Sequence, residues 1–119
     1  MINKKIIKNK KVRQILLDVE RISRRIIGGK LVKIILYGSM ARGGESPSSD
    51  IDIMLLVNDN RENIRKYDNK ISEHIFNLSL KHDIVLSVML KANKQFNSYS
   101  DILPFYRNVQ KEGIEIYGQ

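Results

Sequence analysis

The chain has 119 residues, a formal net charge of +8, a hydrophobic share of 42% and no cysteine. This length fits one domain with a real hydrophobic core and leaves little chain for a separate substrate domain. The composition excludes a disordered protein, a disulfide framework and a thiolate metal site.

The sequence shows no sign of a membrane segment, because no apolar run approaches the ~18 residues of a spanning helix. The N-terminal stretch MINKKIIKNKKVR is basic, but it lacks the apolar segment and cleavage site of a secretory signal. We therefore expect a cytoplasmic protein. The positive charge is typical of a solvated, lysine-rich surface. Without aromatic interleaving or an RNA-binding motif it does not predict direct nucleic-acid binding, although it would attract an anionic nucleotide or an acidic partner.

Hydrophobic spacing predicts helices and strands that alternate around a small mixed β-sheet, which is an α/β (α+β) fold. The predicted elements are a helix over 9–27, strands over 31–37, 50–57 and 83–90, a helix over 61–80, a helix from Pro104 that Gly113 ends, and a strand over 114–117. We expect the strand over 31–37 to be central and covered on both faces. The polar stretch 91–100 is expected to be irregular.

The run ILYGSMARGGESPSSDIDIMLLV combines a strand, a tight turn, a polar loop and a strand that opens with two carboxylates. Asp50 and Asp52 leave the same face of a strand, with Cα atoms roughly 6.6 Å apart. Two acids at that separation can share two divalent cations about 3.5–4 Å apart. The turn at Gly38 and Ser39 supplies backbone N–H groups for an anion. Together these features favour a site for a Mg-nucleoside triphosphate.

Each part of this pattern also has an ordinary structural explanation. A glycine-serine pair after a strand is commonly only a turn, and Asp-x-Asp at a strand start can be a cap or an edge-protecting charge. The combination favours a functional site, because two carboxylates at the lip of an apolar strand cost free energy unless something neutralises them. Magnesium matches the hardness of carboxylate oxygens.

Asp83 is the candidate for a third acid. On a strand over 83–90 that lies beside the strand over 50–57, its side chain would join those of Asp50 and Asp52. This placement depends on strand parity and position alone. The fallback candidates are Glu73 and Asp101.

Gly38-Ser39, a ten-residue spacer and Asp50-Ile51-Asp52 match the signature GSx10DxD, so the chain resembles the DNA polymerase beta-like nucleotidyltransferase superfamily. The chain length, Asp83 and the closing FYRNVQKEGIEIYG resemble its smallest branch, the minimal nucleotidyltransferases. The resemblance implies a polymerase beta palm-like fold and a single minimal nucleotidyltransferase domain over residues 1–119.

The resemblance also implies how a nucleotide binds. The β- and γ-phosphates of ATP would lie on the Gly38 and Ser39 amides and the Ser39 hydroxyl. Arg42 would either contact the leaving phosphates or be a surface residue at the end of a short helix, and the sequence favours neither role.

For the acids, the resemblance implies that Asp50 and Asp52 hold two Mg²⁺ ions. Asp83 would ligate the catalytic ion and help to deprotonate the attacking hydroxyl. The implied reaction is an in-line displacement at the α-phosphorus of ATP.

The acceptor also follows from the resemblance. Members of this branch resemble antitoxins that are commonly encoded beside a HEPN-domain partner. The chain would then transfer AMP to a tyrosine of a HEPN-domain ribonuclease toxin, neutralise it and form a hetero-oligomer with it. Two alternatives stay open: nucleotidyl transfer to a small molecule such as an aminoglycoside, and neutralisation of a toxin by binding without catalysis.

Overall fold

The computed structural model describes residues 9–42 and 50–119. Within these ranges the elements are α1 (Lys10–Ile27), the 3₁₀ turn η1 (Gly28–Lys30), β1 (Leu31–Tyr37), β2 (Ile51–Val57), α2 (Arg61–His82), β3 (Leu86–Ala92), α3 (Asn93–Tyr99), α4 (Pro104–Glu112) and β4 (Ile114–Gly118). No helix in the described part of the chain is long and apolar enough to cross a membrane.

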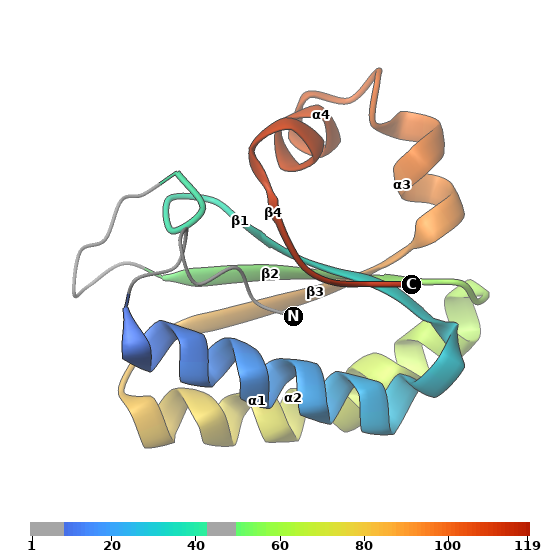
Figure 1. Cartoon of the computed structure of the whole chain (residues 1–119). Coiled ribbons are helices and arrows are strands. Elements are labelled where there is room, and N and C mark those ends of the chain that lie inside the picture. The colour runs from blue at the N-terminus through green and yellow to red at the C-terminus, as the bar shows by residue number, and fades with distance from the viewer. Residues whose placement is uncertain (1–8, 43–49) are drawn as a thin grey trace.

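The four strands form one mixed sheet in the order β3-β2-β1-β4. β1 pairs antiparallel with β2 and with β4, whereas β2 pairs parallel with β3. In Figure 1, α1 and α2 lie below the sheet, and α3 and α4 lie above it. The predicted small mixed sheet, with the strand over 31–37 at its centre, is therefore confirmed.

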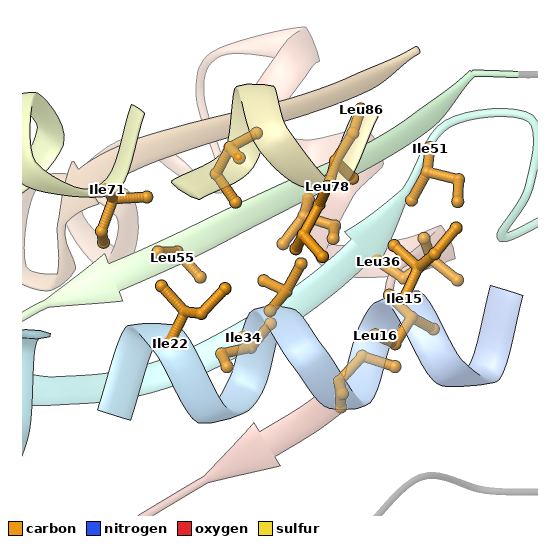
Figure 2. Close-up of a cluster of buried hydrophobic side chains, with 14 of the residues drawn as sticks. Ile15, Leu16, Ile22, Ile34, Leu36, Ile51, Leu55, Ile71, Leu78 and Leu86 are labelled. Carbon is orange, nitrogen blue, oxygen red and sulfur yellow. The ribbon is translucent and has the colours of Figure 1, made fainter. Parts of the chain in front are cut away.

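Two hydrophobic clusters of unequal size hold the layers together. The larger cluster packs α1 and α2 on one face of the sheet, and Figure 2 shows its side chains meeting between the helices and the strands. The smaller cluster lies under α3 and α4 and consists of Ile35, Met54, Leu56, Phe96, Tyr106 and Val109. Because Ile51 and Ile53 belong to the larger cluster and Met54 to the smaller, Asp52 faces the α3–α4 side.

Local sequence signals set the ends of the two long helices. Asn9 caps α1 by accepting a hydrogen bond from the Val12 N–H at 3.1 Å, and Asn60 caps α2 through the Asn63 N–H at 2.8 Å. Gly28, with a φ of 68°, ends α1. A positive φ costs glycine little, because it has no β-carbon, so the predicted helix end at residue 27 is confirmed.

Two elements differ from the prediction. α2 continues to His82 and Asp83 ends it, so the third strand begins at Leu86 and not at residue 83. The stretch predicted to be irregular contains α3, which is fixed by its buried Phe96. The Phe96 ring packs edge-on against Tyr106 of α4, with centroids 5.5 Å apart, so a tertiary contact stabilises a helix that lacks a strong local signal.

Candidate functional site

Gly38, the residue after β1, lies directly against the carboxylate of Asp52. Its φ is 77°, and a β-carbon built on it would stand 2.5 Å from Asp52 Oδ2. Any larger residue would have to displace the carboxylate and would also be strained at this φ. The glycine of the signature therefore allows the turn and the acid to occupy adjacent positions.

The turn after Gly38 is a single helical turn. The Arg42 N–H donates to the Ser39 carbonyl at 3.1 Å and to the Gly38 carbonyl at 3.3 Å. Met40 is buried in the larger core and anchors the turn from below, while Ser39 stays half-exposed. The first N–H groups of such a turn have no partner within it and can bind an anion. The sequence also predicts that Gly43-Gly44 ends this short helix, and these two residues lie outside the described ranges.

Asp50 and Asp52 form a pair of interacting carboxyl groups at the start of β2. Asp50 is exposed just before the strand, and Asp52 is half-buried as its second residue. Burial raises the pKa of Asp52, and the charge of Asp50 raises it further. A divalent cation would relieve this crowding, so the donor set fits a hard metal ion.

Two hydroxyl groups flank Asp52 across the sheet. Tyr37 of β1 and Ser87 of β3 are its direct register partners. Burial and the Asp52 charge raise the pKa of the Tyr37 phenol. The Tyr37 ring meets Phe105 of α4 edge-on, with centroids 5.7 Å apart, so an aromatic pair borders the acid.

Asp83 does not lie on a strand, and this corrects the prediction that strand parity aligns it with the other acids. It is the C-cap of α2 in the left-handed conformation, with φ 50° and ψ 53°, and its N–H donates to the Ser79 and Leu80 carbonyls. It therefore belongs to the helix that covers the face opposite Asp52 (Figure 1). Its catalytic role remains an untested prediction.

The fallback acids do not complete the group either. Glu73 lies exposed on α2, and Asp101 is exposed between α3 and α4. Within residues 9–42 and 50–119, no three His, Cys, Asp or Glu side chains are placed to hold one metal ion. Among the residues that the structure describes, the site therefore has the two carboxylates of Asp50 and Asp52.

Arg42 is engaged at the edge of the site. Its guanidinium donates to Glu112 Oε2 of α4 at 3.2 Å, and both side chains are exposed. The pair ties the turn to α4, although exposed ion pairs contribute only about 0–1 kcal/mol. Contact with a bound phosphate would require Arg42 to leave or share Glu112.

Solved structures confirm the fold. A toxin-antitoxin complex with AMP-PNP contains a chain that matches with a TM-score of 0.53 and 24% identity, covering 87% of this chain and 73% of that one. A mutant of the toxin-antitoxin pair MntA-HpeT matches with a TM-score of 0.51 and 16% identity, at the same coverage of 87% and 73%.

Sequence relatives show the family. "Putative protein adenylyltransferase MJ0604" of Methanocaldococcus jannaschii is 33% identical over 75% of this chain and 81% of its own length. "Putative protein adenylyltransferase MJ0141" of the same organism is 32% identical over 76% and 84%. The family described as "Polymerase beta, Nucleotidyltransferase" matches residues 20–119. The family match over most of the length agrees with the geometry, in which the turn at Gly38 lies against the Asp52 carboxylate. The chain therefore belongs to the polymerase beta nucleotidyltransferase family and is a nucleotidyltransferase.

Proposed function

We propose that this nucleotidyltransferase is a protein adenylyltransferase antitoxin. It transfers AMP from ATP, with Mg²⁺, to a tyrosine of a HEPN-domain ribonuclease toxin and thereby neutralises the toxin. We expect the reaction to take place in the cytoplasm, within a hetero-oligomer of the two proteins.

The observation that carries the proposal is the contact between Gly38 and the Asp52 carboxylate. A polyphosphate bound on the turn would lie beside the two carboxylates. The negative charges of the phosphates and the carboxylates repel each other unless cations lie between them. The arrangement suits an ATP-metal complex better than either component alone.

Each residue then has a defined role. The Gly38 and Ser39 amides and the Ser39 hydroxyl bind the β- and γ-phosphates, and Arg42 is a candidate for an additional phosphate contact. Asp50 and Asp52 would hold the two Mg²⁺ ions. When bound, these ions neutralise the phosphates and activate the attacking hydroxyl. The acceptor hydroxyl loses its proton to solvent and its oxygen forms a bond to the α-phosphorus, the bond from that phosphorus to the bridging oxygen breaks, and pyrophosphate leaves.

The choice of a protein as acceptor rests on the relatives. Both Methanocaldococcus jannaschii proteins are named for protein adenylyltransfer, and the fold neighbours come from toxin-antitoxin complexes. A partner protein would bring its own hydroxyl to the site.

Labelled ATP provides the test. The purified chain, Mg²⁺, α-³²P-labelled ATP and a HEPN toxin encoded next to it should yield a labelled toxin with lost ribonuclease activity. Asp52→Asn should lower transfer at least ~100-fold, since even indirect metal partners cost 10–100-fold. Glu73→Gln and Asp101→Asn remove exposed acids elsewhere and should leave transfer unchanged.

Two outcomes would replace the proposal with its alternatives. Full neutralisation by the double variant Asp50→Ala with Asp52→Ala would show that the chain acts by binding alone. Labelling of an aminoglycoside, with none of the toxin under conditions where the two proteins form a complex, would show a small-molecule enzyme.

A further inference from the structure

A row of three oxygen-bearing side chains crosses the sheet at the site. Tyr37 on β1, Asp52 on β2 and Ser87 on β3 are successive register partners. Neighbouring strands lie about 4.8 Å apart, so Ser87 starts one strand spacing from the acid. The row joins both central strands to the edge strand β3.

Ser87 faces the same side of the sheet as Asp52. Its neighbours Leu86 and Val88 pack into or against the larger core on the opposite side. Side chains alternate along a strand, so the Ser87 hydroxyl points to the α3–α4 side. Ser87 is also exposed, which leaves its hydroxyl open to a ligand that rests on the acids.

The next row along the sheet is apolar. It consists of Ile35, Met54 and Met89, and Met54 is fully buried. The polar surface beside Asp52 on β3 is therefore limited on this side by a hydrophobic row. Asp83, four positions before Ser87, lies at the end of α2 and not on β3.

We propose that Ser87 is the binding residue on β3 that completes the site, with its hydroxyl contacting the cation-nucleotide complex beside Asp52. The inference rests on the proposed binding of a Mg-nucleoside triphosphate at the two carboxylates. A hydroxyl can donate to a phosphate oxygen or accept from metal-bound water, but it adds no negative charge. The described site therefore offers a divalent cation two carboxylates and a neutral oxygen.

This charge balance predicts that cation and nucleotide bind together. Mg²⁺ is commonly held by one or two carboxylates plus the phosphates of the substrate, and it retains several waters. With two carboxylates alone, the chain should bind a divalent cation weakly until the triphosphate arrives. A third carboxylate at position 87 should remove this dependence.

The first experiment measures Mn²⁺ binding by calorimetry and electron paramagnetic resonance, without nucleotide, on the whole chain. Ser87→Asp should tighten Mn²⁺ binding about tenfold or more, because it places a third hard oxygen ligand beside Asp52. Met89→Asp is the matched control, since it adds the same charge on the same face one row away. It should not tighten binding, and equal effects of the two variants would overturn the proposal.

The second experiment measures binding of a non-hydrolysable ATP analogue with Mg²⁺. Ser87→Ala should weaken it about tenfold, the size expected for one hydrogen bond to a charged group, whereas Met89→Ala should not. Unchanged affinity in Ser87→Ala would overturn the proposal, as would an equal loss in Asp83→Asn. Thermal unfolding checks that each variant folds. If Ser87→Asp does not fold, the nucleotide affinity of Ser87→Ala decides whether the Ser87 hydroxyl contacts the cation-nucleotide complex.

Neither experiment uses an acceptor. A failure of AMP transfer to a HEPN toxin would therefore leave these results standing, and unaltered cation and nucleotide binding in the Ser87 variants would leave the toxin proposal standing.

Discussion

The α-carbon of Gly38 packs against the carboxylate of Asp52, and this contact joins the end of β1 to the start of β2. A β-carbon at position 38 would lie 2.5 Å from Asp52 Oδ2 and 3.4 Å from Asp52 Cγ. The spacing in the sequence signature thus has a direct steric meaning. It allows an anion-binding turn to lie on a carboxylate without a side chain between them.

Gly38→Ala should damage both stability and activity. The left-handed φ of 77° costs a non-glycine residue about 1–2 kcal/mol, and the methyl group must also displace Asp52. Thermal unfolding and pyrophosphate release measure the two effects. Gly29→Ala is the control, because a β-carbon there meets nothing within 4 Å, and it should change the free energy of unfolding by no more than about 0.5 kcal/mol. Equal behaviour of the two variants would contradict the steric account.

Asp83 should tolerate asparagine and reject a β-branched residue. Asparagine and aspartate both adopt the left-handed conformation readily, whereas valine at φ 50° should destabilise the chain by about 1–2 kcal/mol. Transfer activity should survive Asp83→Asn, because the residue ends α2 on the far side of the sheet. A large fall in turnover with normal stability would restore Asp83 to the mechanism.

Arg42 and Glu112 allow the two roles of Arg42 to be separated. Arg42→Gln should weaken nucleotide binding about tenfold if the guanidinium moves to a phosphate, while Glu112→Gln, which releases Arg42, should not weaken it. Stability should change by less than about 1 kcal/mol in either variant, since the pair is exposed. If both variants bind the nucleotide as tightly as the wild-type chain, the ion pair only ties the turn to α4.

Asp59 should make stability depend on acid pH. Its carboxylate accepts hydrogen bonds from Asn63 Nδ2 at 2.8 Å, the Asn60 N–H at 2.8 Å and the Tyr67 hydroxyl at 2.9 Å, and these lower its pKa. A lowered pKa contributes stability above the unfolded value of about 3.9, and this stability is lost as pH falls through the folded pKa. Asp59→Ala should therefore have a lower free energy of unfolding than wild type at pH 7. This difference should shrink as the pH falls through the folded pKa of Asp59.

Asp68→Ala supplies the comparison for Asp59, since it removes an equal charge from an exposed position on α2. Chemical denaturation at several pH values measures both variants. The difference in free energy of unfolding between wild type and Asp59→Ala could also stay constant down to acid pH. That result would contradict a contribution from the hydrogen-bonded carboxylate.

Local signals explain what the sequence predicted correctly. The predicted helix end at residue 27 and the predicted helix starts at residues 61 and 104 depend on Gly28, Asn60 and Pro104. These residues act within one turn of the chain, so their effect can be predicted without tertiary structure. The Gly38 and Asp52 pairing was accessible for a similar reason, because a short signature encodes it.

Longer-range effects explain the errors. Asp83 ends a helix in a left-handed conformation that is usually associated with glycine. Because apolar residues follow Asp83 directly, the predicted strand began at residue 83, three residues before the observed start at Leu86. α3 is fixed by Phe96 against Tyr106, a contact between separate helices. Ser87 went unassigned because its place beside Asp52 depends on the register of two strands that are separated by α2.

The two hydrophobic clusters differ in size, and the candidate site lies on the face of the sheet that carries the smaller one. Most of the buried apolar side chains hold α1 and α2 to the far face, while Asp52 and Ser87 share their face with the smaller cluster. Local opening of α3 and α4 should therefore require less free energy than global unfolding. Evolution could redesign the reactive surface for a new acceptor while the scaffold beneath it keeps its shape.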